Sequence, residues 1–150
     1  MPVPVIVDGY NLLYARGEAP APDTRAQLVS DLVGWARPRG RRVVLVFDAW
    51  AGGTREAHEE AHGPVTVCFT RVGERADAFI VRWVAAHPEA VVVTSDRAVQ
   101  QGAARRGAAV LDAESFAARL DGTPPPAHAR APRGPGRRGR GAQAAWLRGL

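Results

Sequence analysis

Three short apolar runs in this sequence are each followed by an aspartate. The runs cover residues 5–7, 43–47 and 90–95, and the aspartates that follow are Asp8, Asp48 and Asp96. Apolar runs of this length, without alternating polar residues, are typical of strands covered on both faces. Residues 65–69 and 108–111 form two further runs of this kind. The sequence therefore predicts about five buried strands.

Segments with apolar residues at helical spacing separate these strands. They predict helices over residues 23–37, 74–86, 97–105 and 112–120. Strands that alternate with helices favour a parallel sheet with helices on both faces. The expected fold class is α/β, a three-layer α/β/α domain with a central parallel sheet of about five strands. At 150 residues the chain is long enough for one such domain.

The charged residues divide the chain into two parts. Residues 1–122 carry fourteen arginines and fifteen acidic residues, whereas residues 123–150 carry six arginines and no acidic residue. The second part also contains three prolines at 124–126 and an Arg/Gly-rich stretch, a composition that cannot build a core. We expect a folded domain over 1–122 and a flexible basic tail over 123–150, in which residues 142–150 could form a short helix.

The sequence carries no signal for a membrane or for export. No apolar run approaches the length of a membrane span, and the first residues enter a strand instead of a signal peptide. The single cysteine, Cys68, excludes an internal disulfide and fits a reducing compartment. We expect a cytoplasmic protein without a membrane partner.

The aspartates at the strand ends should gather at one edge of the sheet, because parallel strands all end on the same side. Asp77 lies in the first turn of the helix after the third strand and belongs to this edge, with Glu74 one turn earlier. Carboxylates brought together repel one another unless a cation joins them. A hard divalent ion such as Mg²⁺ or Mn²⁺ is the natural partner of oxygen ligands, so the pattern points to a metal site.

Each of these residues also has a plain structural explanation. An aspartate at the end of a strand is commonly the N-cap of the next helix, and Asp96 before Arg97 fits that role. Asp48 could line the site without touching a metal. Asn11 could hold Asp8 or a phosphate through its amide, or could cap its own loop. Capping alone does not explain why several carboxylates share one edge.

Four motifs follow one another along the chain. They are Val-Asp-Gly-Tyr-Asn-Leu-Leu at 7–13, Val-Phe-Asp-Ala at 46–49, Phe-Thr-Arg-Val-Gly-Glu-Arg-Ala-Asp at 69–77 and Thr-Ser-Asp-Arg at 94–97. As an ordered set they resemble the YacP-like NYN-domain family, part of the PIN-like nuclease superfamily. The resemblance covers about residues 5–120.

This resemblance implies a metal-dependent endoribonuclease built on a PIN-like (NYN) sheet. Its catalytic residues would be Asp8, Asp77 and Asp96, which would hold Mg²⁺ or Mn²⁺, with Asp48 near the metal. Supporting residues would be Asn11, Glu74 and Ser95. Some relatives act on mRNA in association with translation, which makes RNA the expected substrate and the ribosome a candidate partner.

The sequence departs from the family pattern in two places. Arg75 stands where we expect a small hydroxyl residue in the segment Gly-Glu-x-Ala-Asp, so the start of the following helix should be capped differently. The Arg/Gly-rich tail has no counterpart in the pattern. Neither departure removes a carboxylate.

Several side chains near the acidic edge are candidates for contact with RNA. Arginines could hold phosphates that flank the cleaved bond, and the candidates are Arg16, Arg55, Arg71, Arg75 and Arg97. Tyr10 could stack on a base. The alternative is an ordinary solvated surface in a chain in which every basic residue is arginine.

Other readings of the sequence are weaker. Residues 58–62 match the zinc-protease motif H-E-x-x-H, but Gly63 and Pro64 would end its helix at once, so we expect a polar surface helix with at most adventitious zinc or nickel binding. An aspartate-dependent phosphatase would use Asp8 as nucleophile, but it needs a second aspartate where Tyr10 stands. A non-catalytic RNA- or ribosome-binding module with the same fold remains the main alternative.

Overall fold

The structure of the protein is a computed structural model that describes residues 3–48, 57–124, 126–134 and 150. Its elements in chain order are β1 (Val5–Asp8), α1 (Gly9–Ala15), α2 (Pro22–Ala36), β2 (Val43–Phe47), β3 (His58–His62), β4 (Val65–Phe69), α3 (Ala76–Ala86), β5 (Val91–Val93), α4 (Arg97–Arg105), β6 (Ala109–Leu111) and α5 (Ala113–Asp121). None of the described helices combines the length and the apolar character needed to cross a bilayer.

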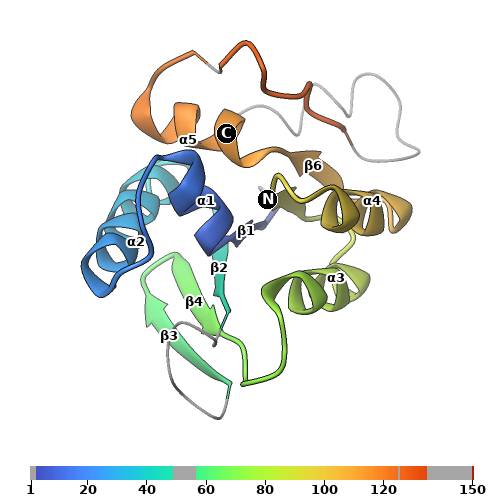
Figure 1. The fold of residues 1–150 in the computed structure, drawn as a ribbon, viewed down its shortest axis with the longest axis horizontal. Helices are drawn as coiled ribbons and strands as arrows, with labels where there is room; N and C mark the ends of the chain where they lie inside the picture. The colour runs from blue at the N-terminus through green and yellow to red at the C-terminus, as the bar shows by residue number, and fades with distance from the viewer. Residues whose placement is uncertain (1–2, 49–56, 125, 135–149) are drawn as a thin grey trace.

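The six strands in the described part of the chain form one sheet in the order β3-β4-β2-β1-β5-β6. Neighbouring strands are parallel except β3 and β4, which are antiparallel. Helices cover both faces (Figure 1). The predicted three-layer α/β/α class with a central parallel sheet is therefore confirmed, and β3 is an antiparallel addition at one edge.

The two faces of the sheet carry separate apolar cores. On one face, α1, α2 and α5 enclose the larger core around Phe47 and Phe116. On the other face, α3 and α4 cover a second core around Ile80. Successive residues of β1 enter different cores, Val5 the first and Ile6 the second, which explains why the strand is apolar without alternation.

The central position of β1 determines where the candidate site lies. β1 is flanked by β2 and β5, with Asp8 opposite Val46 and Val7 opposite Val93. Asp48 follows β2 directly and Asp96 lies a few residues after β5. Three chain segments far apart in sequence thus end beside one another.

Gly9 has a different role from the one that its sequence position predicts. A glycine directly after an aspartate at a strand end predicts a sharp turn. Gly9 is instead the first residue of α1, a helix that the sequence pattern did not indicate, and its φ is not positive. A Cβ at this position would lie 2.4 Å from the Phe47 ring and 2.9 Å from the Val46 carbonyl oxygen. Glycine is needed because α1 begins in close contact with β2.

The expectation of a surface helix at 58–62 is wrong. These residues form the exposed edge strand β3, and Gly63, with φ of 58°, turns the chain back into β4. Residues four apart are about 13 Å apart in a strand. His58 and His62 therefore lack the spacing of a helical chelating pair. Instead, His58 Nε2 lies 3.5 Å from Glu60 Oε2, and His62 Nε2 lies 3.4 Å from Glu60 Oε1.

Part of the basic tail lies against the domain. Arg133 and Val110 of β6 form an antiparallel bridge through two backbone hydrogen bonds of 2.8 and 2.9 Å. Residues 126–134 are thereby held beside the edge of the sheet. The short helix predicted for 142–150 falls outside the described residues, apart from Leu150, which packs against the larger core.

We predict that Gly9→Ala lowers the free energy of unfolding by about 2 kcal/mol, because the new methyl group overlaps the Phe47 ring and a backbone oxygen. Gly34→Ala is the matched control. Gly34 is exposed inside α2 with open space around it, so alanine should stabilise the protein by about 0.5–1 kcal/mol. Urea unfolding of both variants measures the difference, and equal effects would contradict the assigned contact.

Candidate active site

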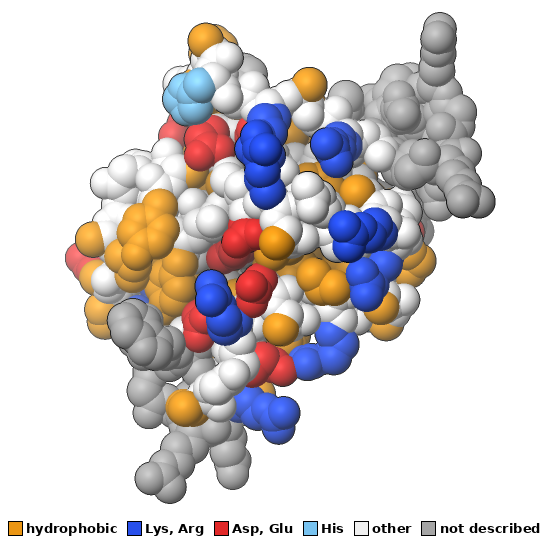
Figure 2. All heavy atoms as spheres, turned by 45° about the vertical axis from the view of Figure 1, so that its right-hand side comes forward, with side chains coloured by type: hydrophobic (Ala, Val, Ile, Leu, Met, Phe, Trp, Pro, Cys, Tyr) orange, Lys and Arg blue, Asp and Glu red, His pale blue; other side chains and the backbone are white. Residues whose placement is uncertain are grey.

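The candidate site lies at the edge where the parallel strands end. Asp8, Asp48 and Asp96 arrive from the ends of β1, β2 and β5, and Asp77 lies in the first turn of α3. Figure 2 shows acidic side chains near the middle of one face of the molecule, with arginine side chains around them. The fold thus brings to the region of Asp8 carboxylates that lie about 40, 70 and 90 residues after it in sequence.

Asp8 is the central member of this group. It is half-buried as the N-cap of α1, where its Oδ1 accepts a hydrogen bond of 3.4 Å from the backbone amide of Asn11. Burial is the main reason that the pKa of Asp8 rises to about 6. The Asn11 bond opposes this rise, and the charges of Asp96, Asp77 and Asp48 add to it in decreasing order. All three other aspartates therefore act electrostatically on Asp8.

Asp96 and Ser95 lie in the loop between β5 and α4. Asp96 is the N-cap of α4, with Oδ1 accepting from the Val99 amide at 3.1 Å. The Ser95 hydroxyl donates to Glu114 Oε2 at 2.6 Å. The Ser95 amide donates to Asn11 Oδ1 at 2.7 Å. The capping explanation thus applies to Asp96 as it does to Asp8, and Asn11 uses its side chain to join the two loops.

A set of hydrogen bonds near the loop that carries Asp96 was not predicted from the sequence. Gln100, in α4, is buried and donates from Nε2 to the Thr94 carbonyl at 2.7 Å. Arg130, in the tail, donates from Nη1 to Gln100 Oε1 at 2.9 Å, and its amide bonds Asp112. The tail therefore stabilises the loop that carries Asp96. Arg130 lies 30 residues beyond Gln100 in a stretch without pattern, so no sequence signal pointed to it.

Asp77 and Glu74 have different surroundings. Asp77 Oδ1 accepts from the Ala78 amide at 2.8 Å and lies 3.6 Å from Arg75 Nε. Glu74, predicted as a supporting residue, accepts two bonds of 2.6 and 3.3 Å from Arg82, and this pair lowers the pKa of Glu74. As the departure at Arg75 led us to expect, the start of α3 has no side-chain cap at that residue.

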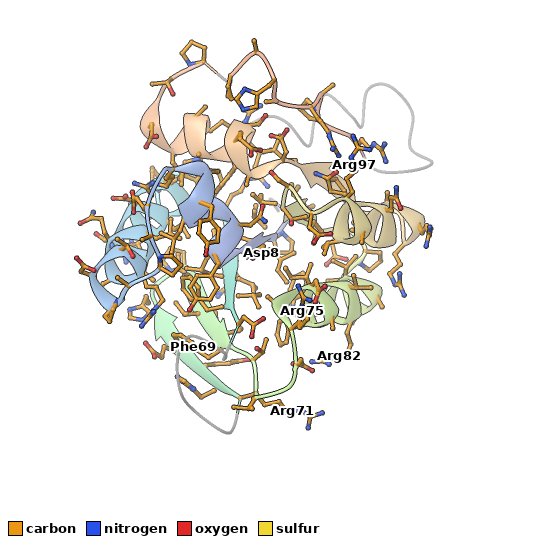
Figure 3. The ribbon with its side chains drawn as sticks, viewed as in Figure 1. Asp8, Phe69, Arg71, Arg75, Arg82 and Arg97 are labelled. Atoms are coloured by element: carbon orange, nitrogen blue, oxygen red, sulfur yellow. The ribbon has the colours of Figure 1, made fainter. Side chains whose placement is uncertain are left out.

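Arg55 lies outside the described residues, and the other predicted RNA-contacting arginines fall into two groups. Arg71, Arg75 and Arg97 are exposed, and Figure 3 shows Arg97 on one side of Asp8 and the other two on the opposite side. The Arg16 side chain is only 12% exposed and makes contacts of 2.7 Å to Asp31 and 3.3 Å to Glu18. Arg16 joins α1 to α2, and its side chain is committed within the protein.

The residues fit a divalent ion by donor chemistry and charge. Four carboxylates supply hard oxygen donors, and three of them raise the pKa of the fourth, a repulsion that a cation would relieve. Within residues 3–48, 57–124, 126–134 and 150, no three acidic, His or Cys side chains converge on one position that could hold an ion. Mg²⁺ commonly binds through one or two carboxylates and several waters, so a looser arrangement is compatible with it.

A mostly parallel sheet between two layers of helices, with aspartates after its central strands, is the arrangement expected of a PIN-like domain. Comparison with known proteins identifies the family of the chain within this class. The sequence pattern of the YacP-like NYN domain matches residues 5–144, nearly the whole chain, and the protein belongs to that family. The resemblance seen in the sequence is thereby confirmed.

Solved structures agree with this assignment. The crystal structure of Rae1 (YacP) from Bacillus subtilis is 27% identical, with a TM-score of 0.65, over 81% of this chain and 75% of that chain. Its W164L mutant is 25% identical, with a TM-score of 0.64, over 80% and 76%. No curated protein matches the chain significantly.

We predict that Asp8→Asn stabilises the metal-free protein at pH 7.5. Folding raises the pKa of Asp8 from 3.8 to about 6, so the stability linked to its protonated form is complete below pH 3.8 and is lost as the pH rises through about 6. Asparagine keeps the cap without the charge. Urea unfolding in EDTA should show a gain of up to about 3 kcal/mol at pH 7.5 and little change at pH 3.5. A gain of the same size at both pH values would contradict the assignment.

We predict that Arg130→Ala lowers the free energy of unfolding by about 1 kcal/mol, because it removes the partner of the buried Gln100 side chain. Arg133→Ala removes the same charge from an exposed side chain and should stay within about 0.5 kcal/mol of the wild type. Parallel urea titrations compare the two variants. If both behave alike, the Arg130 side chain does not hold Gln100.

Proposed function

We propose that the protein is a metal-dependent endoribonuclease that hydrolyses phosphodiester bonds of RNA. The observation that carries the proposal is the effect of Asp96, Asp77 and Asp48 on the pKa of Asp8, in a chain of the YacP-like NYN family. By the same resemblance, the products would carry a 5′-phosphate and a 3′-hydroxyl. Asp8, Asp77 and Asp96 are the proposed catalytic residues.

These three aspartates are also proposed to hold Mg²⁺ or Mn²⁺, directly or through waters bound to the ion. When bound, such an ion supplies a Lewis acid and an activated water for attack on phosphorus. The protein's own part is to hold the carboxylates in place. Asp8 and Asp96 are fixed as helix N-caps, and the bond between Ser95 and Asn11 keeps their loops together.

The exposed arginines support RNA as the substrate. Arg97 lies on one side of Asp8 and Arg71 and Arg75 on the other, as expected for residues that bind phosphates on both sides of a cleaved bond (Figure 3). Tyr10 packs on Phe47 with ring centroids 5.0 Å apart and borders a cavity beside the site. We extend the proposal to mRNA on the ribosome, which the family resemblance suggests.

A non-catalytic RNA-binding module is the second candidate. It is favoured by one observation, that no three ligand side chains in the described part of the chain converge on a single position. Such a module would bind RNA with the same arginines and would not cleave it. A cleavage assay therefore separates the two functions.

We predict that the wild-type protein cleaves a labelled single-stranded RNA with Mn²⁺ or Mg²⁺ and is inactive in EDTA. Asp8→Asn and Asp96→Asn should each lower the rate at least about a hundredfold, because several kcal/mol of transition-state stabilisation depend on the ion. Asp121→Asn, at the exposed end of α5, is the matched control and should keep full activity. Cleavage that persists in EDTA, or in a folded Asp8→Asn variant, would exclude the mechanism.

A further inference from the structure

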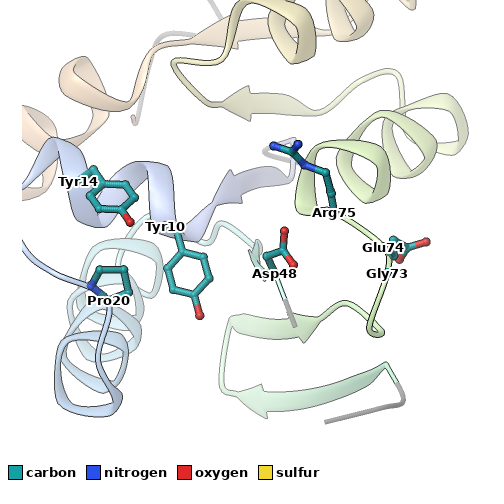
Figure 4. A pocket seen from close by; sticks show the side chains of 7 residues that line it. All are labelled: Tyr10, Tyr14, Pro20, Asp48, Gly73, Glu74 and Arg75. Atoms are coloured by element: carbon teal, nitrogen blue, oxygen red, sulfur yellow. The ribbon is translucent and has the colours of Figure 1, made fainter. Parts of the chain in front are cut away.

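The two edges of the central sheet carry charges of opposite sign. Among the described residues, the ends of the parallel strands and the segments that lead from them to the next helices hold two arginines and five carboxylates, which are Asp8, Asp48, Glu74, Asp96 and Asp112. Figure 4 shows two of these acidic side chains, Asp48 and Glu74, with Arg75 around the cavity at this edge. The edge that holds the candidate active site is therefore acidic.

The opposite edge, where the parallel strands begin, is basic. The described segments before these strands are 3–4, 37–42, 63–64, 87–90 and 106–108, and they contain five arginines and one carboxylate, Glu89. Four of the arginines lie directly before β2 and form the basic edge cluster, which is Arg37, Arg39, Arg41 and Arg42.

The basic edge cluster is too far from the catalytic aspartates to serve the cleaved bond. The five residues of β2 separate it from Asp48 by about 16 Å. Exposed charges are largely screened beyond about 8 Å at physiological ionic strength. The cluster therefore needs an explanation of its own.

Two members of the cluster are held within the protein. Arg39 lies over the Trp35 ring, 5.2 Å from its centroid, and its Nη1 donates to the Trp35 carbonyl at 2.7 Å, in the last turn of α2. A cation is favourable there because the C-terminal end of a helix is partly negative. Arg41 is buried, and its Nη1 donates to the Val3 carbonyl at 3.0 Å. Both side chains fix positive charge at this edge.

The other two members, Arg37 and Arg42, are exposed. In the part of the chain that the structure describes, no carboxylate forms an ion pair with either side chain. Arg37 Nη2 lies 2.6 Å from the position that a Cβ of Gly63 would take, so this guanidinium lies against the turn before β4. Arg37 and Arg42 thus present their charges to solvent.

The like charges of the cluster repel one another. Burial lowers the pKa of Arg41, and the charge of Arg39 lowers it further. The end of α2 offsets only about half of one elementary charge. A bound anion would relieve the remaining repulsion, and an anion with several charges would relieve it most.

We propose that Arg37 and Arg42, together with the charges of Arg39 and Arg41, bind the phosphate backbone of RNA at the edge of the sheet opposite the catalytic aspartates. The proposal rests on the proposed function and adds a substrate class, which is RNA long enough to extend from the active site to this edge.

RNA suits this surface by its charge density. It carries one phosphate on each nucleotide, and arginines that neutralise these phosphates release condensed counterions. A guanidinium group also matches the oxygens of a phosphate with two parallel N–H donors. The contact needs no metal ion, whereas the acidic edge repels RNA until a cation binds there.

The first test is equilibrium binding of a fluorescein-labelled oligouridine of about 40 nucleotides in EDTA, over a series of salt concentrations. The double variant Arg37→Ala/Arg42→Ala should bind about tenfold more weakly than the wild type. The slope of log Kd against log salt should fall by about 1.4, since each lost contact to a single strand removes about 0.7. Wild-type affinity and slope in the double variant would overturn the proposal.

Two variants are the controls for charge and position. Arg37→Lys/Arg42→Lys keeps both charges and should keep the wild-type slope. Arg133→Ala removes an exposed arginine beside β6 and should change the affinity less than about twofold. If Arg133→Ala weakens binding as much as the double variant, net charge and not the basic edge cluster holds the RNA.

The second test compares two lengths of RNA in Mn²⁺. For the long oligouridine, the double variant should raise KM about tenfold and leave kcat unchanged. An oligouridine of about four nucleotides, at about 3.4 Å per stacked nucleotide, ends before the opposite edge, so its cleavage should be unchanged. An equal rise in KM for both lengths would contradict the position of the surface.

A third measurement separates RNA from acidic polypeptides as the occupant. Polyglutamate has a lower charge density than RNA, and it should compete with the labelled oligouridine at least about tenfold more weakly than unlabelled oligouridine does. Equal competition at equal charge concentration would assign the surface to acidic proteins and overturn the proposal.

These outcomes are distinguishable from failure of the proposed function. Binding in EDTA that depends on Arg37 and Arg42, without cleavage in Mn²⁺, would remove the nuclease and keep the surface. Cleavage in Mn²⁺ with the same KM for the long oligouridine in the wild type and the double variant would keep the nuclease and remove the surface.

Discussion

The hydrogen bond between the Ser95 amide and Asn11 Oδ1 joins two parts of the chain that are 84 residues apart. One part follows β1 and the other follows β5, and each carries an aspartate that begins a helix. The bond adds to the pairing of β1 with β5 in holding the two loops side by side. It thereby contributes to the relative position of Asp8 and Asp96, on which the chemistry that we propose depends.

Like charges at this edge are unfavourable for the folded protein without a cation. They add to the pKa of Asp8, which burial raises most, since folding places this carboxylate where its ionised form is disfavoured. The two apolar cores on the faces of the sheet offset this cost, together with the contacts of Gln100 and Arg130 behind Asp96. Stability is thus provided away from the site, and the site itself is arranged for binding.

Much of the fold follows from local sequence patterns. Five strands are predictable because each is an apolar run buried on both faces, and four helices because their apolar residues recur at helical spacing. β3 was missed because its residues are all exposed and it is a strand only through pairing with β4. The helix α1 was missed because it has only seven residues and opens with Gly9, which we took for a turn.

The candidate site was predictable to a similar degree. The gathering of Asp8, Asp48, Asp77 and Asp96 at one edge follows from the rule that parallel strands end on the same side. Which side chains they meet does not follow from it. The commitment of Arg16 to Asp31, and of Glu74 to Arg82, depends on rotamers and on packing between elements, and local sequence does not specify these.

The bridge between Arg133 and Val110 affects how readily molecules of this protein associate through the edges of their sheets. Exposed sheet edges present unpaired backbone groups that can recruit a strand from another chain. At β6 the tail occupies part of that edge, whereas at β3 two histidines and two glutamates cover it with polar and charged side chains. The tail thus hinders strand addition at β6, and polar and charged side chains hinder it at β3. Both features disfavour aggregation of the protein at high concentration.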